Sequence, residues 1–426
     1  MFRLDNTSQN YDWGSAADIP RFIGTQPDGT PLAEIWMGTH PLGPSAVLLG
    51  AASEGAGSEG AVPLSDVAGD LPFLFKILAA DRPLSLQVHP SSAMARAGFD
   101  LEEAAGVPLE SAGRTYKDPH HKPEMAYALT TFDSLVGFRP TAEILRVLHG
   151  IESPLTQSLA EDLRANPGFD GIVRLVERLL TEDVPDSDIR EVVSRCHDLV
   201  EQGIDIKRAY LTATEIADHF PTDIGVVISL TLNRLTLQPG EAAFLGTGII
   251  HAHLRGMCLE IMASSDNVLR AGLTSKPLNP EGLVKCLDKG MSRLARVTPE
   301  PFGFSTDVFS PDVEEFALAV SQCSRAEPGG TLLPPAPRRI VVCTGGEVEL
   351  VNASGQRLTL TRGQSVYAGP DDGDLHAVGM GEVAQAYTPT SDTVVGELID
   401  LIPAFRERHL RRGRSDRGPS GRRRHP

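Results

Sequence analysis

Gln87 and His89 lie two residues apart in the strand-like stretch LSLQVHPSSAM, which begins at Leu84. In a β-strand, side chains at positions i and i+2 point to the same face. An amide oxygen and an imidazole that share a face can bind a divalent metal ion when further ligands lie nearby. A single histidine on a strand more often has a structural role with a hydrogen-bonded ring, so a metal site requires those further ligands.

Two other stretches offer such ligands. Glu124 opens the apolar run in KDPHHKPEMAYAL, so its carboxylate could point inward from a strand. His251 lies in LQPGEAAFLGTGIIHAHLRG, and its spacing from Gly240 and Gly248 resembles the second metal motif of the cupin superfamily, which aims a histidine into a β-barrel. Gly246 stands where that motif usually has proline. The Gln-x-His pair would take the place of the superfamily's His-x-His, with one imidazole fewer.

A carboxylate, two imidazoles and an amide oxygen form an ordinary ligand set for a divalent metal ion with an open catalytic position. Imidazole ligands favour zinc over magnesium. We therefore expect one zinc ion per chain, held by Gln87, His89, Glu124 and His251.

The elements that must position these residues follow two patterns. The first 140 residues are rich in Gly and Pro with short apolar runs such as LPFLFKILA and SLVGF, which indicates short strands and turns. Over about 141–220, apolar residues recur at i, i+3 and i+4, as in GIVRLVERLL, which predicts amphipathic helices, with Asp186 or Ser187 as a cap. Strand-like runs return over about 225–275. A helical domain thus interrupts a β domain.

A further β region extends over about 301–402. In RRIVVCTGGEVELVNASGQRLTLTRGQSVYAG, Gly345-Gly346 and Ser354-Gly355 have the spacing of turns between alternating strands. We expect a mainly β protein with two cupin-like jelly-roll β-barrel domains and an inserted α-helical domain. The predicted units are a metal-binding catalytic cupin domain (1–140 with 221–300), the helical insertion (141–220), a C-terminal cupin-like domain without metal (301–403) and a disordered basic tail (404–426).

Composition limits the class of protein. The sequence contains no run of about 18 apolar residues, which is the length needed to span a bilayer. The polar start MFRLDNTSQNYDWGS lacks the apolar core of a signal peptide. The 5 cysteines are scattered without Cys-x-x-Cys pairs, which favours free thiols in a reducing cytoplasm over disulfides or a thiolate zinc site. The net charge is −17 although 9 arginines follow residue 405. The acidic body therefore repels nucleic acid and membranes, and we expect neither as a specific partner.

Five stretches resemble, in order, the signatures of the type I mannose-6-phosphate isomerase family: QNYDWGS, LAEIWMGTHPLGPS, LPFLFKILAADRPLSLQVHP, HKPEMAYAL and IIHAHLRGMCLEIMASSDNVLRAGLTSKPLN. The stretch SDNVLRAGLTSK is the most diagnostic of them. The resemblance implies that the four expected metal ligands bind zinc and that Arg270 lies across the active site. It also implies that the pocket is lined by Trp13, Glu34, Lys76, Ser85, His121, Lys122, Glu260, Asp266 and Lys276.

The reaction implied by the resemblance interconverts mannose 6-phosphate and fructose 6-phosphate. A proton moves between C1 and C2 of an opened sugar through an enediol, and zinc would act as a Lewis acid that stabilises the developing oxyanion. The cations available for the phosphate group are Lys76, Lys122, Arg270 and Lys276. Candidates for the general base are a water molecule on the zinc ion, Lys122 if burial lowers its pKa, His121, Glu260 and Asp266.

Several of these residues also have an ordinary structural interpretation. Lys76 in FLFK could extend its ammonium group from a strand end toward solvent. Asp266 and Arg270 could form an ion pair that orders a loop. Trp13 could belong to the core, and Glu34 could have either role.

Two positions depart from the family pattern, which usually has Asn at His120 and often Tyr at His253. Neither is an expected ligand, although the polarity of the pocket could differ. In the C-terminal region, the spacing from Gly363 leads to Asp374 where a ligand histidine would stand, so we expect this barrel to bind no metal.

Two other functions share these features. One is a related cupin isomerase that acts on another sugar phosphate, such as glucose 6-phosphate. The other is a non-catalytic cupin that binds a sugar phosphate, which would be expected to lose metal ligands. All four ligand positions carry ligating atoms, which favours an enzyme. A sugar phosphate is the expected partner, and a monomer is the expected state.

Overall fold

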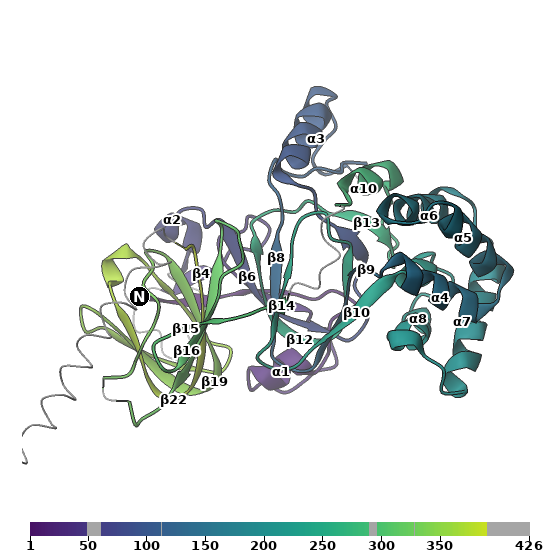
Figure 1. The fold of residues 1–426 in the computed structure, drawn as a ribbon. Coiled ribbons are helices and arrows are strands. Elements are labelled where there is room, and N and C mark those ends of the chain that lie inside the picture. The colour runs from purple at the N-terminus through teal and green to yellow at the C-terminus, as the bar shows by residue number, and fades with distance from the viewer. Residues whose placement is uncertain (49–60, 112, 289–295, 328, 390–426) are drawn as a thin grey trace, which may run out of the picture.

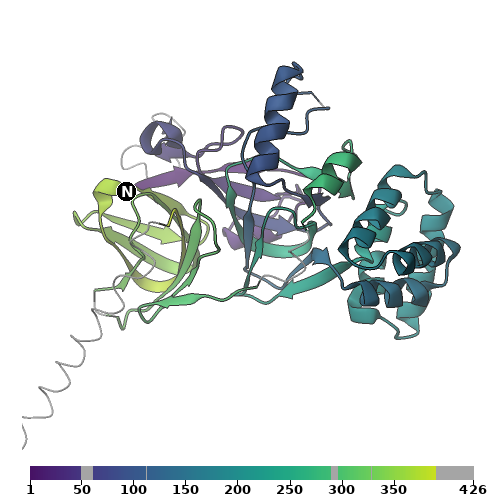
Figure 2. The same ribbon diagram turned by 45° about the horizontal axis from the view of Figure 1, so that its top comes forward.

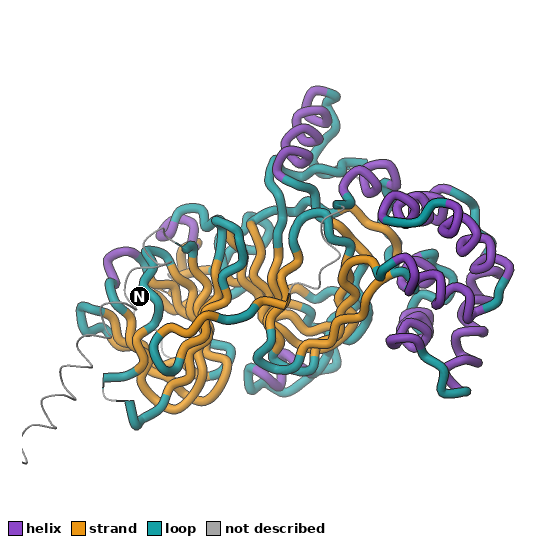
Figure 3. Tube along the Cα trace, viewed as in Figure 1, coloured by secondary structure: helices purple, strands orange, loops and turns teal. Residues whose placement is uncertain are grey.

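The computed structural model describes residues 1–48, 61–111, 113–288, 296–327 and 329–389. Figure 1 shows three parts in a row: a β region with the C-terminal strands, a second β region in the middle, and a group of helices at the other end. Figure 3 shows the same order by element type. The fold is mainly β with two antiparallel sheets, and most helices are gathered in one part, as the sequence predicts. The predicted basic tail, 404–426, lies outside the described residues.

The middle sheet is built around one long strand, β12 (His251–Ala263). Its main path runs in the order β14 (Arg296–Val297), β11 (Ala242–Leu245), β8 (Glu124–Ala128), β12, β6 (Phe73–Ala80), β3 (Glu34–Met37) and β2 (Thr7–Gln9). The first part of β12 pairs instead with β7 (Leu86–Val88) and β9 (Phe132–Phe138), which pair with β13 (Leu269–Gly272) and β10 (Leu232–Leu237). The register of β12 shifts between His253 and Arg255, and such a bulge bends a strand. β12 thus connects both halves of the sheet.

The second sheet contains strands from the beginning and the end of the described chain. Its order is β15 (Glu300–Phe302), β16 (Thr306–Phe309), β17 (Ala317–Cys323), β22 (Leu375–Tyr387), β19 (Arg339–Asn352), β21 (Ser365–Ala368), β1 (Phe2–Asp5), β4 (Ala46–Leu48) and β5 (Ala61–Pro63). Two further strands pair with it, β18 (Thr331–Leu332) with β22 and β20 (Arg357–Thr361) with β19. The segment 1–140, predicted as part of one domain, therefore contributes strands to both sheets.

The two predicted hairpin turns have different outcomes. Ser354 and Gly355 lie between β19 and β20, so this turn is confirmed. Gly345 and Gly346 lie inside β19, so the prediction of a turn there was wrong. The register between β19 and β22 shifts after Cys343, and Gly346 has a φ of 68°. The glycine pair forms a bulge in a continuous strand, because the pairing with β22 continues on both sides of it.

Helices α4 to α8 form the predicted helical insertion. They are α4 (Thr141–Ile151), α5 (Pro154–Ala165), α6 (Phe169–Thr181), α7 (Asp186–Glu201) and α8 (Ala209–Ala217), with the 3₁₀ turn η1 (Ile206–Arg208) before α8. α7 has Pro185 at its cap position and no side-chain cap, so the prediction that Asp186 or Ser187 caps it was wrong. Proline fits there because an N-terminal backbone N–H has no intrahelical partner.

The other helices lie beside the sheets. They are α1 (Asp18–Phe22), α2 (Leu64–Ala68), α3 (Ser92–Ala104), α9 (Gly225–Ser229), α10 (Pro280–Cys286) and the 3₁₀ turn η2 (Pro370–Asp372). In Figure 2 the helical insertion and the second sheet lie on opposite sides of the middle sheet. None of the described helices is long and apolar enough to cross a membrane.

Strand β6 is buried on both faces, which explains why all of its residues except Lys76 are apolar. Phe75 and Ile77 belong to a core shared with Val342 of the second sheet. Leu78 packs into a separate core on the opposite face of β6. Lys76 shares this second face because side chains alternate along a strand. An ammonium group thus enters a buried interior, where it requires partners.

Candidate active site

Three neighbouring strands place His251, Gln87 and Arg270 in one row. β12 pairs with β7 at His251 and Gln87, and β7 pairs with β13 at Gln87 and Arg270. Directly opposite residues in antiparallel strands have their side chains on the same face. Two expected metal ligands and the arginine therefore face the same side of the sheet.

Glu124 and His89 complete the predicted ligand set. Glu124 begins β8, and His89 directly follows β7. Ligand atoms of His89, Glu124 and His251 lie within 4.8 Å of one another, and all three residues are buried. Nε2 of His89 lies 3.2 Å from Oε1 of Glu124, and Nε2 of His251 lies 3.3 Å from its Oε2. The amide nitrogen of Gln87 lies 3.4 Å from Nε2 of His251, and a half-turn of the amide brings its oxygen to the same place.

Backbone carbonyl groups fix the protonation of both imidazoles. Nδ1 of His89 lies 2.8 Å from the carbonyl oxygen of Asn267, and Nδ1 of His251 lies 2.9 Å from that of Ile249. A carbonyl oxygen can only accept, so each Nδ1 carries hydrogen and each Nε2 of a neutral ring presents a lone pair. Burial lowers the pKa of His89 to about 4, which favours the neutral ring.

This arrangement fits a metal ion. Nε2 of His89 is buried without a hydrogen-bond partner, and it faces a carboxylate oxygen that also offers only lone pairs. Burial opposes ionisation of Glu124, but His89 and the ammonium group of Lys122, 3.1 Å away, hold its pKa well below the usual range. A divalent cation would satisfy all of these lone pairs. Within the described parts of the chain, this is the single group of three metal-ligating side chains with such spacing.

A second buried cluster surrounds Lys76. Trp36, Lys76 and Glu260 lie opposite one another on β3, β6 and β12. Nζ of Lys76 lies 3.3 Å from Oε1 of Glu34 and 3.0 Å from Oε2 of Glu260. The indole N–H of Trp36 donates to Oε2 of Glu34 over 2.7 Å, and Nε2 of His253 lies 3.2 Å from Oε1 of Glu260. Both carboxylates therefore have partners on both oxygens.

The charges of this cluster stabilise one another. Burial opposes ionisation of Glu260, but Lys76 and a hydrogen bond from His253 lower its pKa to about 2. Burial also opposes a charged Lys76, but Glu34 and Glu260 raise its pKa above the usual value. Lys76 is 6% exposed, so it does not extend toward solvent from a strand end. It is a buried ammonium group held between two carboxylates.

Comparisons with known proteins identify the family of this chain. Residues 1–141 match a family model described as phosphomannose isomerase type I, catalytic domain. Mannose-6-phosphate isomerase of Salmonella typhimurium is 34% identical over 399 residues, which cover 91% of this chain and 99% of that protein. The chain belongs to the type I phosphomannose isomerase family. Mannose-6-phosphate isomerase 1 of Arabidopsis thaliana is 32% identical, with coverage of 88% and 90%.

Solved structures of the family have the same fold. The Salmonella typhimurium mannose 6-phosphate isomerase, bound to its substrate fructose 6-phosphate and to zinc, aligns with a TM-score of 0.80 and 32% identity. The alignment covers 92% of this chain and all (100%) of that one. A zinc-bound holo form of mannose 6-phosphate isomerase aligns with the same TM-score and 31% identity, over 91% and 99% of the two chains.

Arg270 and Lys276 differ from the other cations that the family resemblance places in the pocket. Neither takes part in an ion pair among the described residues. Arg270 is half-buried, and burial lowers its pKa. Asp266 places Oδ2 3.5 Å from Nε2 of His40, so the ion pair with Arg270 that the sequence allowed is not formed. Partial burial and the neighbouring Arg270 lower the pKa of Lys276, which lies on the loop after β13.

The remaining predicted pocket residues lie around these clusters. His121 is in the loop before β8, and its Nε2 lies 2.5 Å from Oε1 of Glu315 in the other β region. Ser85 is half-buried directly before β7. Trp13 is half-buried and stacks on Tyr11, with the ring centroids 5.6 Å apart, and it also packs against the inner core of the middle sheet.

Asn267 orients the metal cluster, although the sequence analysis did not select it. Its carbonyl oxygen accepts from His89, and its side-chain amide donates to the carbonyl oxygens of Asp118 (2.7 Å) and His120 (2.8 Å). Its side-chain oxygen accepts from the backbone N–H of Lys117 over 2.8 Å. Asn267 thus ties the loop before β13 to the loop before β8. Its place within the diagnostic SDNVLRAGLTSK stretch was the available signal.

His40 is the second residue that was missed. It is buried, and its ring contacts Trp36 edge-on with the centroids 5.1 Å apart. Its Nδ1 accepts from the backbone N–H of Leu42 over 3.3 Å, so its Nε2 carries the hydrogen that faces Asp266. The available signal was its position in the family stretch LAEIWMGTHPLGPS.

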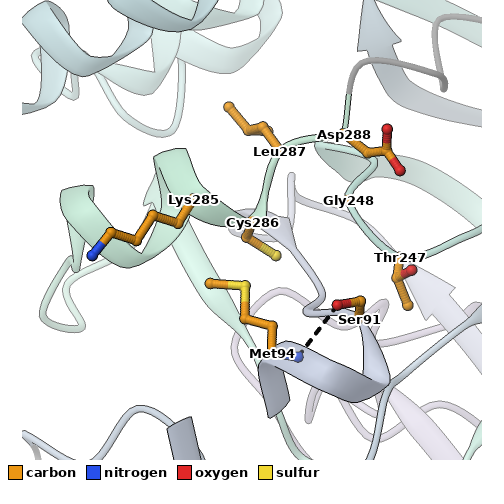
Figure 4. A pocket seen from close by; sticks show the side chains of 8 residues that line it. All are labelled: Ser91, Met94, Thr247, Gly248, Lys285, Cys286, Leu287 and Asp288. Atoms are coloured by element: carbon orange, nitrogen blue, oxygen red, sulfur yellow. Dashed lines mark hydrogen bonds between the residues drawn. The ribbon is translucent and has the colours of Figure 1, made fainter. Parts of the chain in front are cut away.

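A hollow lies between the start of α3 and the end of α10. Figure 4 shows its lining residues, which are Ser91, Met94, Thr247, Gly248, Lys285, Cys286, Leu287 and Asp288. The hydroxyl of Ser91 accepts from the N–H of Met94 and caps α3. None of the predicted site residues lines this hollow. Its relation to the site is indirect, because the N–H of Gly248 donates to the carbonyl oxygen of His89 over 2.9 Å.

Proposed function

We propose that this chain is a zinc-dependent aldose-ketose isomerase that interconverts mannose 6-phosphate and fructose 6-phosphate. The observation that carries the proposal is the buried Nε2 of His89, which lacks a hydrogen-bond partner and faces Glu124 beside the Nε2 of His251. Family membership supports the choice of reaction, because the relatives over nearly the whole chain are mannose-6-phosphate isomerases.

Four side chains of this protein would form the zinc site. Gln87, His89, Glu124 and His251 would hold the zinc ion, and zinc would supply Lewis-acid stabilisation of the negative charge that develops on the sugar oxygens. The carbonyl groups that hold both Nδ1–H atoms keep the Nε2 lone pairs available.

The phosphate end of the substrate requires cations that are not already paired. Lys122 lies beside Glu124, and Lys76 lies between two carboxylates. Arg270 and Lys276 have no acidic partner among the described residues, and Arg270 shares a face with Gln87. We therefore assign the oxyanions of the substrate to Arg270, with Lys276 in support. A guanidinium group can bind phosphate oxygens through two parallel hydrogen bonds.

The proton transfer requires a base whose pKa lies near the working pH. Glu260 is poorly suited, because its pKa is about 2 and both of its oxygens have partners. Lys122 acts better as a cation, since its ammonium group contacts Glu124. We favour His121 over Asp266, because an imidazole can take up and release a proton and because the carboxylate of Glu315 lies beside this ring, 2.5 Å from its Nε2.

The finer predictions about the fold and the setting belong to the same proposal. We propose that each antiparallel sheet closes into a cupin-type jelly roll and that the second one binds no metal. A monomer in the cytoplasm, without membrane or specific nucleic-acid partners, is consistent with the acidic body and the scattered free cysteines.

A coupled assay and metal analysis test the function together. Purified protein should contain about one zinc ion per chain and convert mannose 6-phosphate to fructose 6-phosphate. Chelation should abolish turnover, and added zinc should restore it. A parallel assay with glucose 6-phosphate as the substrate tests the alternative that the enzyme acts on another sugar phosphate. Full activity of rigorously metal-free protein would contradict the proposal.

A further inference from the structure

Glu315 connects the second sheet to the active-site rim. It lies two residues before β17, and Phe316 next to it is fully buried, which anchors the backbone. The hydroxyl of Thr388 donates to the carbonyl oxygen of Glu315 over 3.3 Å. The side chain leaves the second sheet and places Oε1 2.5 Å from Nε2 of His121. A residue far away in the sequence thus contacts the loop that leads into β8.

The loop that carries His121 is held firmly in place. Asn267 binds this loop at several backbone atoms, and the hydroxyl of Ser265 donates to Asp118 within it over 2.8 Å. His121 directly precedes Lys122, whose Nζ lies 3.1 Å from Glu124 of the metal cluster. The ring of His121 is 27% exposed, so it lies at the rim where a ligand can approach.

The contact with Glu315 decides which nitrogen of His121 can react. A carboxylate oxygen accepts, so Nε2 carries the hydrogen and Nδ1 of the neutral ring holds the lone pair. Among the described residues, no hydrogen bond involves Nδ1 of His121. The arrangement resembles the general carboxylate-imidazole pair, in which the carboxylate fixes the tautomer and stabilises the imidazolium that forms.

The other oxygen of Glu315 points to the same role. Oε2 is buried and has no hydrogen-bond partner, so this carboxylate is incompletely satisfied while His121 is neutral. The hydrogen bond from His121 is the main cause that lowers the pKa of Glu315, against the opposing effect of burial. A full positive charge on the ring would compensate this carboxylate better than the neutral ring does.

We propose that Glu315 is a positioning residue for the isomerisation, contributed by the second sheet, which orients His121 and fixes hydrogen on its Nε2 so that Nδ1 accepts the substrate proton. This inference rests on the proposed function. In the forward step the C2–H bond of the opened sugar breaks, the proton moves to Nδ1, and the electron pair forms the C1–C2 double bond of an enediolate. The hydroxyl proton of O2 moves to O1. Return of the proton from Nδ1 to C1 forms the ketose and leaves His121 neutral.

A double-mutant cycle on the full chain tests the proposal. Glu315→Ala should lower kcat by about tenfold to a hundredfold with KM nearly unchanged, because the residue acts on the proton transfer and not on binding. Glu315→Gln keeps an acceptor without the charge and should lose less. In the His121→Ala background, Glu315→Ala should have no further effect on kcat. Zinc content and melting temperature, measured for each variant, separate catalysis from folding.

Glu314→Ala is the matched control, because Glu314 is the exposed neighbour in the same segment and should leave kcat unchanged. Equal kcat for Glu315→Gln, Glu315→Ala and the wild type would overturn the inference while the proposed function stands. The inference would also be overturned if Glu315→Ala lowered kcat by the same factor in the His121→Ala background as in the wild type. Absence of isomerase activity in the zinc-loaded wild type would overturn the proposed function itself, and the inference with it.

Discussion

At the scale of single residues, two backbone carbonyl groups orient the imidazole rings of the expected metal ligands. The carbonyl oxygens of Asn267 and Ile249 hold hydrogen on the Nδ1 atoms of His89 and His251. Both rings are fully buried, so they cannot easily turn to present the other nitrogen. The ligand set is therefore prepared by the fold before any ion binds.

Replacement of His251 by Ala should reduce bound zinc strongly and leave the protein folded. The metal site loses one of two imidazoles, whereas the surrounding core consists of other side chains. Metal analysis and circular dichroism of the variant check this. His197→Ala is the control, because His197 is exposed on α7 and should change neither quantity. One zinc ion per chain in the His251 variant would show that the site lies elsewhere.

Arg270→Ala should lower kcat/KM by about a hundredfold or more, because a contact with a substrate oxyanion is worth several kcal/mol whereas an exposed ion pair is worth roughly 0 to 1 kcal/mol. Zinc content should stay normal. Arg270→Lys should restore only part of the activity, since a point charge cannot replace the two-pronged guanidinium group. Arg190→Ala, which removes an exposed ion pair with Asp186, is the control. Normal kinetics with a lower melting temperature would make Arg270 a structural residue.

Sequence reasoning could find the metal cluster because its donor types are rare and their strand spacing is readable. It did not select Asn267 or His40, because their places in two family stretches do not reveal their roles, which depend on contacts with Asp118 and Asp266. The same limit applies to Lys76. Its sequence context suits a strand end near solvent, and only the tertiary contacts with Glu34 and Glu260 show that it is buried.

At the scale of elements, the spacing of apolar residues predicts helices, whereas glycine pairs do not by themselves distinguish a turn from a bulge. The helical insertion was predictable, because apolar spacing over many turns has no other explanation. The pair Gly345-Gly346 was not, because two glycines fit a turn as well as a bulge, and the choice depends on the pairing of β19 with the distant β22. Local sequence specifies where the backbone can bend but not whether the chain reverses there.

Substitution of Gly346 by Ala tests the bulge. A Cβ atom there would lie 2.1 Å from the carbonyl oxygen of Met380, and the φ of 68° also disfavours any side chain. We expect a loss of about 3 kcal/mol in the free energy of unfolding. Gly355→Ala is the matched case, because its φ is 83° but no atom lies within 4 Å, so about 1 kcal/mol should be lost. Equal losses in urea denaturation would contradict the bulge geometry.

At the scale of the whole molecule, Asp133 connects the helical insertion to the middle sheet. This buried carboxylate on β9 contacts Arg234 of β10 (2.6 Å), Arg255 of β12 (3.1 Å) and Arg208 of η1 (3.6 Å). Burial opposes its ionisation, but hydrogen bonds from Arg234 and Thr236 lower its pKa to about 2. The folded pKa thus lies below the unfolded value of about 3.9, so the stabilisation is present above about pH 4 and is lost as the pH falls toward 2.

Asp133→Asn should therefore destabilise the protein at pH 7 by on the order of 2 kcal/mol or more, because the shift of nearly two pKa units is lost and Arg234 keeps its buried charge. Between pH 4 and 2 the variant should lose less further stability than the wild type. Melting temperatures at several pH values measure both effects. Asp81→Asn is the control at an exposed carboxylate. Parallel curves for wild type and Asp133→Asn would contradict the assignment.

The domains could be predicted only in part from the sequence, because the pairing of strands does not depend on local sequence alone. The sequence showed a helical segment between β segments and a later β region. It did not show that β1 leaves the first β segment and pairs with β21 and β4. Short strands with one or two apolar residues fit many partners, so pairing depends on the whole sheet.

The position of β1 has a consequence for biosynthesis. Phe2–Asp5 is synthesised long before its partner β21, which begins at residue 365. At about 5–20 residues per second, roughly 20 to 70 s pass before that partner is synthesised. Throughout this interval Phe2 and Arg3 of β1 lack the strand with which they pair in the folded protein. The nascent chain must therefore be protected from aggregation until its last strands emerge, and folding chaperones are the natural means.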